Sequence, residues 1–405
     1  MPYSLPKIPK QKRISSIARK LTALFVGVIL IFIFIFAVFP LLQSKPNLSS
    51  GIIADVIEGK MVQVSAGDTH SVALMEDGTV WQWGDNFHDG SIVDCVEKLN
   101  QLIFARPIET NNYAIKKIDI DDVTSIAAGN SMSAAIKSDG TLWTWGFNAF
   151  GQLGNGTDIL NTGGKILIDS SIPYKILDDV KSVSLGNYWG MAVKNDGTLW
   201  AWGKNTYGVL VTSPRGIHNC KPVSIMGGVV EARAGAKHGI ALREDGAVWI
   251  WGSNESRQIG YWYDSLDDVP EPMHIIDNAV KVAATYVHSM VLLEDDTLLI
   301  WGEDKFIGTS QASKYSVSDF GHTTAIVGGI NIPFILTDDG KLYVWHKEET
   351  SMRPIRESVI HVSMFSEHAL LVEENGTVWA FGLNDFGQLG DGTTNDSSTF
   401  VLIYG

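Results

Sequence analysis

Residues 61–84 read MVQVSAGDTHSVALMEDGTVWQWG, and this stretch decides the fold. Its segments VQVSA and SVALM alternate apolar and polar residues with a period of two, which is typical of half-buried β-strands. The Asp77-Gly78 pair that follows supplies the positive φ values that a tight hairpin needs. In the last segment, TVWQWG, Trp81 and Trp83 fall on the same side of a third strand. The stretch therefore predicts three strands joined by short turns.

The same pattern recurs six more times along the chain. The further copies occupy residues 123–146, 180–203, 229–252, 280–302, 324–346 and 359–382. Eleven of the 13 tryptophans fall in its two aromatic columns, and only Trp189 and Trp262 lie outside them. Self-similarity at a period of roughly 50 residues indicates a repeat architecture, either stacked or closed into a ring.

Most copies are followed by an apolar segment that begins with Pro. These segments lie at 106–108, 173–176, 222–223, 272–273 and 354–355. Because Pro fits only an edge strand, each segment predicts a fourth, outermost strand. Seven copies of four strands, with no stretch of helical period, predict an all-β, seven-bladed β-propeller over residues 60–405.

The copies resemble the regulator-of-chromosome-condensation repeat. The hallmark of that family is a Gly-x-x-His, Asp-Gly-x-Val-Trp-x-Trp-Gly core followed by Asn-x-x-Gly-Gln-Leu-Gly. The last element stands here at residues 148–154 and 384–390, with degraded forms at 205–208 and 258–260. The resemblance implies the propeller fold but fixes no function, because functional sites are grafted onto folds. With the N-terminal segment described below, the chain is similar to a bacterial-type, membrane-anchored or secreted member.

Closure of the ring is open between two segments. Residues 399–404 have the pattern of a fourth strand with no copy after it, and we expect them to pair with strands of the first copy. Residues 52–57, which read IIADVI, compete for the same place.

The N-terminus predicts a membrane anchor. Residues 21–42 form an uncharged apolar run long enough to span a bilayer as a helix, preceded at 1–20 by six basic residues and no acid. We therefore expect a cytoplasmic tail at 1–20, a transmembrane signal anchor at 21–42 and a linker at 43–59, with the propeller outside the cytoplasm. An uncleaved anchor is favoured over a cleaved signal and a secreted protein, because the run exceeds a signal h-region and ends in a poor cleavage site.

The charge and composition of the chain limit the classes of ligand and of function that we expect. Residues 46–405 carry 24 basic and 45 acidic residues, a net charge of −21. Such a body repels phosphate, so we expect no nucleic-acid binding. Cys95 and Cys220 do not show metal-ligand spacing, and the sequence leaves open whether they pair. No phosphate loop, Gly-x-Ser-x-Gly elbow or HExxH is present, so we expect no enzyme, cofactor or metal.

A histidine recurs at one position of the repeat, and histidine is a common metal ligand. The His of Gly-x-x-His recurs as His70, His238, His288 and His368, while Met132, Trp189 and Ile332 replace it in the other copies. Imidazoles spread round a ring with apolar residues between them do not converge on one ion. We therefore expect structural histidines that bond nearby backbone.

The up-and-down order of the strands in a blade predicts which face of the ring carries the binding surface. In an up-and-down blade, the loop after the first strand and the insertion after the third strand share one face, and the Asp-Gly turns occupy the other. The first loops differ from copy to copy, and variable loops on a rigid ring are where binding usually resides. Their aromatic residues are the proposed protein-binding anchors: Tyr188, Trp189 and Tyr286, with Tyr261, Trp262 and Tyr263 from the fourth insertion.

The predicted function is a membrane-tethered, extracytoplasmic β-propeller that binds an unknown protein or cell-envelope ligand. One alternative is inhibition of a secreted enzyme, since a β-lactamase inhibitor propeller is known in the resembled family. Another is guanine-nucleotide exchange on a small GTPase, the activity for which that family is named. The anchor and the acidic body argue against exchange, because the GTPase would lie across the membrane.

Overall fold

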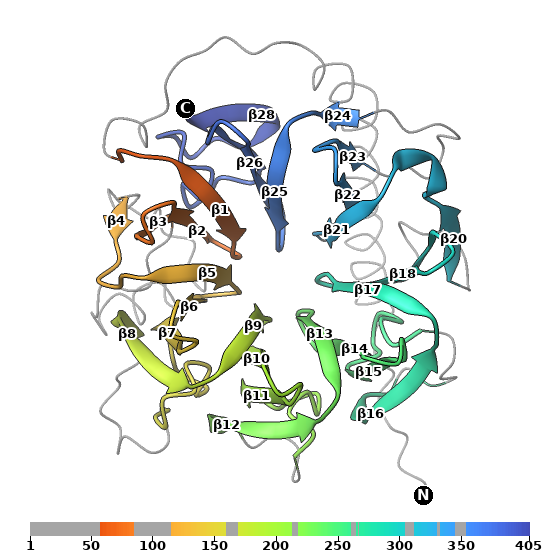
Figure 1. Ribbon diagram of the computed structural model, residues 1–405. Coiled ribbons are helices and arrows are strands. Elements are labelled where there is room, and N and C mark those ends of the chain that lie inside the picture. The colour runs from red at the N-terminus through yellow and green to blue at the C-terminus, as the bar shows by residue number, and fades with distance from the viewer. Residues whose placement is uncertain are drawn as a thin grey trace, which may run out of the picture.

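The computed structural model describes residues 57–84, 115–158, 169–212, 218–260, 265, 267–303, 312–329, 333–344 and 354–405. In this part of the chain, seven antiparallel sheets contain four strands each, and within a sheet the strands follow one another in chain order. The sheets stand round a central axis as blades, with the first strand of each nearest the axis (Figure 1). The prediction of a seven-bladed, all-β propeller is confirmed.

The first four blades have the following strands. Blade 1 contains β1 (Met61–Ala66), β2 (His70–Met75), β3 (Val80–Gly84) and β4 (Lys116–Lys117). Blade 2 contains β5 (Val123–Ala128), β6 (Met132–Lys137), β7 (Leu142–Phe147) and β8 (Asp169–Leu177). Blade 3 contains β9 (Val180–Leu185), β10 (Trp189–Lys194), β11 (Leu199–Gly203) and β12 (Asn219–Met226). Blade 4 contains β13 (Val229–Ala234), β14 (His238–Arg243), β15 (Val248–Gly252) and β16 (Val269–Ile276).

The last three blades complete the ring. Blade 5 contains β17 (Ala279–Ala284), β18 (His288–Leu293), β19 (Thr297–Gly302) and β20 (Ser313–Ser316), followed by a short 3₁₀ helix, η3 (Ser318–Phe320). Blade 6 contains β21 (Thr323–Gly328), β22 (Pro333–Thr337), β23 (Leu342–Val344) and β24 (Pro354–Arg356). Blade 7 contains β25 (Val359–Met364), β26 (His368–Glu373), β27 (Val378–Gly382) and β28 (Ser397–Tyr404).

The Asp-Gly hairpin differs in detail from the prediction. In blade 1 the Gly78 amide donates to the Met75 carbonyl at 3.0 Å, and the Met75 amide donates to the Thr79 carbonyl at 2.9 Å. Gly78 has a φ of 82°, whereas Asp77 is not in the left-handed region. The loop is therefore a three-residue turn with a bulge at Gly, and only one positive φ is needed. The Asp77 carboxylate accepts the amide and hydroxyl of Thr79 and holds the turn locally.

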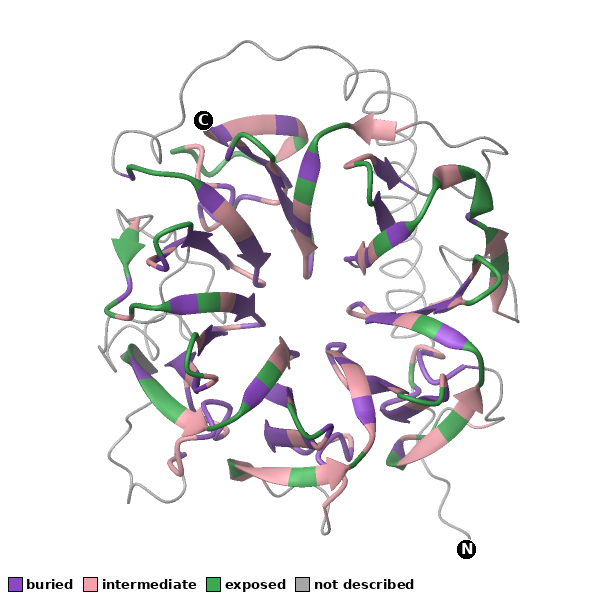
Figure 2. Ribbon diagram, in the orientation of Figure 1, coloured by how far each residue is buried: buried purple, intermediate pink, exposed green. Residues whose placement is uncertain are grey.

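The core lies between the blades and along their second and third strands (Figure 2). One aromatic column is fully buried, namely Trp83, Trp145, Trp202, Trp251 and Trp301. Each of these indole N–H groups donates to the preceding blade, for example Trp202 to the Gln152 carbonyl at 2.8 Å. The column therefore fastens neighbouring blades together as well as filling the core.

The ring closes differently from the prediction. β28 pairs with β27, from Val378 opposite Tyr404 to Gly382 opposite Ser397, so it is the outermost strand of blade 7. The prediction that this segment pairs with the first copy is wrong, because blade 7 supplies only three strands before it and needs a fourth. Blades 7 and 1 are joined instead by side chains, including the Trp83 indole, which donates to the Gln388 carbonyl at 2.9 Å.

The remaining predictions on segments have mixed outcomes. The Pro-led segments of blades 2, 3, 4 and 6 lie in outermost strands, as predicted. Residues 106–108 lie outside the described residues, as do residues 1–56, which include the predicted anchor at 21–42. Within residues 57–405, the described elements include no helix with the length and hydropathy to cross a membrane.

Candidate functional site: the first-loop face

The loops after the first and third strands share one end of each blade, as the up-and-down order of the strands predicted. A backbone amide at the end of the third strand, or directly after it, donates to a carbonyl of the first loop in blades 2, 3, 4 and 7. The pairs are Phe147 to Ser131, Lys204 to Tyr188, Ser253 to Lys237 and Leu383 to Glu367, at 2.8–3.0 Å. We call this end of the ring the first-loop face, and the end with the Asp-Gly hairpins the turn face.

The first loops of blades 1 to 4 are tied to one another. The Asp68 amide donates to the Gly129 carbonyl at 3.1 Å, and the Asn130 amide donates to the Gly186 carbonyl at 3.3 Å. Asn187 continues the series with a 3.2 Å bond to the Ala236 carbonyl. Because each loop is held by its neighbour, the side chains on this face stand on a fixed platform.

Tyr188 occupies a strained position on this platform. It has a φ of 66°, and no other first-loop residue of the described chain has a positive φ without being Gly. An aromatic residue in the left-handed region costs on the order of 1 kcal/mol or more, and such strain gathers at functional sites. The half-buried ring lies 5.3 Å from the Phe150 ring and 6.1 Å from the Phe147 ring, measured between centroids.

Lys204 lies between two of these rings. Its Nζ is 4.6 Å from the Phe150 centroid and 5.3 Å from the Tyr188 centroid, within cation–π range of both. Burial lowers the pKa of Lys204, and the charge of Lys237 lowers it further. The Phe150 ring also contacts His218 edge-on at 5.3 Å. We call Phe147, Phe150, Tyr188, Lys204 and His218 the aromatic–lysine cluster.

Blades 3 to 5 extend this surface toward Tyr286. Lys237 Nζ lies 5.0 Å from the Tyr207 centroid and 3.3 Å from a Glu255 carboxylate oxygen. Tyr286 is half-buried in the first loop of blade 5, and burial, followed by the charge of Asp68, raises the pKa of its phenol. Two of the predicted anchors, Tyr188 and Tyr286, thus lie on one face together with two lysines.

The opposite part of the face, from blades 7 and 1, is acidic. Burial raises the pKa of Glu367, and the charges of Asp68, Asp396 and Asp385 raise it further. Burial also raises the pKa of Asp68, partly offset by a hydrogen bond from Ser366. The side-chain amide of Asn130 donates to an Asp68 carboxylate oxygen at 2.9 Å. The face is therefore uneven in charge, with carboxylates on the part from blades 7 and 1, and lysines among aromatic rings, with Glu255 beside Lys237, on the other part.

Trp189 does not belong to this surface. Its side chain is 1% exposed, and its indole N–H lies 3.2 Å from the carbonyls of both Gly235 and Ala236 in the next blade. The prediction that Trp189 is an exposed anchor is therefore wrong: it begins β10 at the position that His70 holds in blade 1, and it packs inward. Tyr261, Trp262 and Tyr263 lie outside the described residues.

The repeated histidines are structural, but their partners differ from the prediction. His70 Nε2 bonds the Ser133 hydroxyl at 2.9 Å, and the equivalent bonds join His238 to Ser289 and His368 to Ser71. In these three cases the partner is a serine of the next blade rather than nearby backbone, whereas His288 contacts the Thr285 hydroxyl of its own blade at 3.4 Å. Across the described ranges, no group of three or more His, Cys, Asp or Glu side chains is arranged to hold a metal ion.

Sequence reasoning missed the lysines and Phe150. Phe150 and Tyr207 occupy the variable position just before Gly in Asn-x-x-Gly, and both are aromatic. That shared choice in two neighbouring copies was a usable signal. The pairing of Lys204 with Tyr188 could not be predicted from the sequence, because the two residues are 16 positions apart and come together only at the end of a strand.

Comparisons with known proteins agree with this architecture. A sequence profile described as "RCC1-like domain" matches residues 42–315, and one described as "Regulator of chromosome condensation (RCC1) repeat" matches residues 375–401. The human protein named "Regulator of chromosome condensation" is 28% identical over 167 residues, which cover 38% of each chain. The chain thus aligns with well under half the length of that relative.

Two solved structures show the same fold. Human WBSCR16 superimposes with a TM-score of 0.55 at 16% identity, covering 86% of this chain and 83% of its own. Prp20p from Saccharomyces cerevisiae, described with its binding to Gsp1p and histones, has a TM-score of 0.50 at 20% identity and covers 85% and 77%.

Proposed function

The chain belongs to the family of RCC1-like domains, and on that premise we propose that it is a protein-binding module whose partner docks on the first-loop face. The observation that carries the proposal is Tyr188, which is held in a strained backbone conformation beside Lys204 and Phe150. The other first loops of the described chain have no non-Gly residue with a positive φ, so the repeat itself does not require a strained tyrosine at this position. Tyrosine is favoured in binding surfaces because it offers a rigid, amphipathic contact.

The proposed role is binding rather than catalysis, and it uses protein partners rather than nucleic acid. The unevenly charged face fits a partner that presents acidic groups to Lys204 and Lys237 and basic groups to Asp68 and Glu367. Complementary charge of this kind speeds association and selects among partners more than it adds affinity.

We further propose that residues 21–42 anchor the module in a membrane with the propeller outside the cytoplasm, in the manner of a bacterial-type membrane-anchored member. The supporting observation is the uncharged run preceded only by basic residues. Protease added to intact cells is expected to degrade the propeller and to leave the N-terminus protected. A protected propeller would favour guanine-nucleotide exchange on a small GTPase, the activity implied by the family resemblance. Release of a shortened chain would indicate a cleaved signal.

The binding proposal is tested by recovering the partner with the full-length chain from the membrane fraction of its own cells. The double variant Tyr188→Ala/Tyr286→Ala is compared with Tyr174→Ala, which removes a tyrosine that is 42% exposed on β8, away from the first-loop face. We expect the double variant to weaken binding at least about thirtyfold, as truncation of anchoring aromatics does, and the control to bind normally. Equal binding by all three proteins would reject the first-loop face.

The identity of the recovered partner distinguishes a scaffold from the remaining alternative, an inhibitor of a secreted enzyme. A secreted enzyme that loses activity when bound would make the module an inhibitor, whereas an envelope protein with unchanged activity would make it a scaffold.

A further inference from the structure

The first strands of the seven blades line a central channel of about 480 Å³. Because side chains alternate along a strand, the third and fifth residues of each first strand line it. At the fifth position Arg233 is the only charged residue, and the six others are serine, alanine or valine. Arg233 therefore extends into space that its small neighbours leave open.

Three serines at the fifth position hold adjacent blades together through their oxygen atoms. The amides of Ala128, Ala234 and Ala66 donate to Ser65, Ser184 and Ser363, at 2.8, 2.9 and 3.0 Å. A hydroxyl that accepts an amide keeps its own hydrogen to donate. In the described chain, none of these three hydroxyls has an assigned acceptor. The channel wall thus carries three serine hydroxyl groups that can each donate a hydrogen bond to a ligand.

Arg233 adds charge to these donors. Its Nη2 lies 2.7 Å from a Glu231 carboxylate oxygen, and this ion pair engages one corner of the guanidinium. A guanidinium carries five N–H donors in a fixed fork, so the rest of the group remains able to bind a second oxyanion. The Arg233 side chain is 42% exposed, which leaves it open to the channel.

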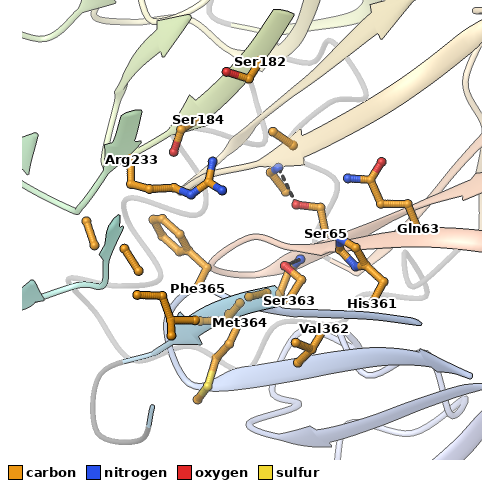
Figure 3. Close-up of a pocket in the computed structure, with 18 of the residues that line it drawn as sticks. Gln63, Ser65, Ser182, Ser184, Arg233, His361, Val362, Ser363, Met364 and Phe365 are labelled. Carbon is orange, nitrogen blue, oxygen red and sulfur yellow. Dashed lines mark hydrogen bonds between the residues drawn. The ribbon is translucent and has the colours of Figure 1, made fainter. Parts of the chain in front are cut away.

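The two sides of the channel supply different groups. Arg233 and Ser184 lie on one side, and Ser65, Ser363 and His361 lie on the other (Figure 3). Burial, followed by the charge of Arg233, lowers the pKa of His361 to about 4, so the imidazole is neutral at pH 7. Lys281 also lines the channel, and with Arg233 and Glu231 it leaves a net positive charge there. The channel is therefore cationic inside a body whose net charge is −21.

We propose that the central channel binds a small organic anion, with its carboxylate or phosphate on Arg233 and the Ser184 hydroxyl and its other polar groups toward the serine hydroxyls of the opposite side. Hydroxyl donors and a guanidinium are the groups that recognise an oxyanion, and no nucleic acid or protein segment is needed to fill the space. The volume lies within the range of small-molecule sites, so the ligand is larger than a bare inorganic ion. This proposal is independent of the partner on the first-loop face.

The experiment titrates the purified full-length chain with inorganic phosphate and, separately, with succinate, at constant ionic strength in sodium chloride. We expect saturable one-to-one binding of at least one of them by calorimetry. Preference for phosphate would identify a phosphorylated ligand, and preference for succinate a carboxylic acid. The absence of saturable binding of both anions at millimolar concentration would reject the site.

Three variants assign the binding to the channel. Arg233→Gln is expected to weaken binding about tenfold or more, because it removes the charged donor. Glu231→Gln removes the competing carboxylate and is expected to tighten binding several-fold. Lys175→Gln, which removes an exposed cation on β8, is the control and is expected to bind normally.

The opposite signs of the first two variants separate ligand binding from a structural role. If the ion pair only stabilises the fold, both variants lower the thermal midpoint and neither tightens binding, which would overturn the proposal. Should Arg233→Gln fail to fold, the imidazole resonances of His361 in the unaltered protein provide a second readout. They must shift on addition of the bound anion, and unchanged resonances would place the anion elsewhere.

Discussion

The turn face and the first-loop face are built from the same seven repeats but use their polar side chains in opposite ways. On the turn face, Asp77, Asp139 and Asp196 accept hydrogen bonds from a Thr two residues later, and these bonds lower the pKa of each carboxyl. On the first-loop face, burial raises the pKa of Asp68 and Glu367. One face satisfies its charges within each turn, whereas the other gathers charges from several loops.

The difference shows where the repeat is free to vary. A turn whose side chain bonds its own backbone is independent of the neighbouring blades, so Asp-Gly-Thr recurs unchanged in blades 1 to 3 and is altered at a single position in each of the other four. A first loop needs only to return the chain to the second strand, and its side chains are left for other uses. The following predictions test this division, from the largest expected effect to the smallest.

The two buried tryptophans beside the first-loop face should behave as core residues. Trp189→Ala and Trp202→Ala are each expected to lower the free energy of unfolding by about 3–5 kcal/mol, because both side chains are at most 1% exposed. Urea unfolding measures both. A loss below about 1 kcal/mol for Trp189→Ala would return that residue to the binding surface.

Acid should destabilise the ring through its buried histidines. Burial lowers the pKa of His238 and of His368 to about 3, far below the usual 6.5. The unfolded chain therefore binds more protons below pH 6.5, so the stability present above that pH is lost as the pH falls toward 3. Each histidine contributes on the order of 1.4 kcal/mol per pH unit in this window.

Unfolding free energies at several pH values check this slope. His238→Gln, which can still bond the Ser289 hydroxyl, should flatten the dependence. An identical slope in the His238→Gln protein would contradict the assignment.

The turn face should respond to backbone conformation alone. Gly140 has a φ of 78°, and an added Cβ would meet nothing closer than 3.7 Å, so Gly140→Ala is expected to cost about 1–2 kcal/mol from the left-handed backbone. Gly227 has no positive φ and open space around it, and Gly227→Ala is the matched control, with an expected change within about 0.5 kcal/mol. Similar losses at both sites, measured by thermal unfolding, would mean that the turn conformation is not what Gly140 provides.

The smallest change in stability is expected on the first-loop face. Tyr188→Gly relieves a positive φ, which should regain about 1 kcal/mol, and it loses ring contacts worth a similar amount. The expected net change is therefore under about 1 kcal/mol, while partner binding falls. A loss of several kcal/mol in urea unfolding would make Tyr188 part of the core and would remove the contrast between the faces.

The fold was predictable because each copy repeats residues with strong local meaning. Alternating strands, Gly after Asp and paired tryptophans such as Trp81 and Trp83 all indicate the same blade. The site was less predictable because its contacts cross between blades. Tyr188 and Trp189 are adjacent aromatic residues, but Tyr188 is half-buried on the first-loop face and Trp189 is buried in the core. In the sequence, only the alignment of Trp189 with His70 indicates that the Trp189 side chain points inward.

The pairing that closes the ring and the charge of the central channel could not be predicted from the sequence for a related reason. Residues 399–404 do form a strand, but which strand they pair with depends on how many strands blade 7 already has. Arg233 stands in an ordinary alternating strand, and its meaning comes from the six short side chains at equivalent positions round the ring.

The side-chain closure of the ring bears on the order in which blades can be connected. Among the described strands, none is exchanged across the junction of blades 7 and 1. That junction uses the same Trp-to-carbonyl and His-to-serine bonds as junctions inside the chain. The end of the last strand also contacts the segment just before the first strand, since the Tyr404 hydroxyl donates to the Gly59 carbonyl. A circularly permuted gene that starts at another blade, with a short linker bridging residues 405 and 57, would therefore break no sheet. Such permutants would move residues 21–42, the anchor proposed above, from blade to blade and so tilt the proposed binding face toward or away from the bilayer.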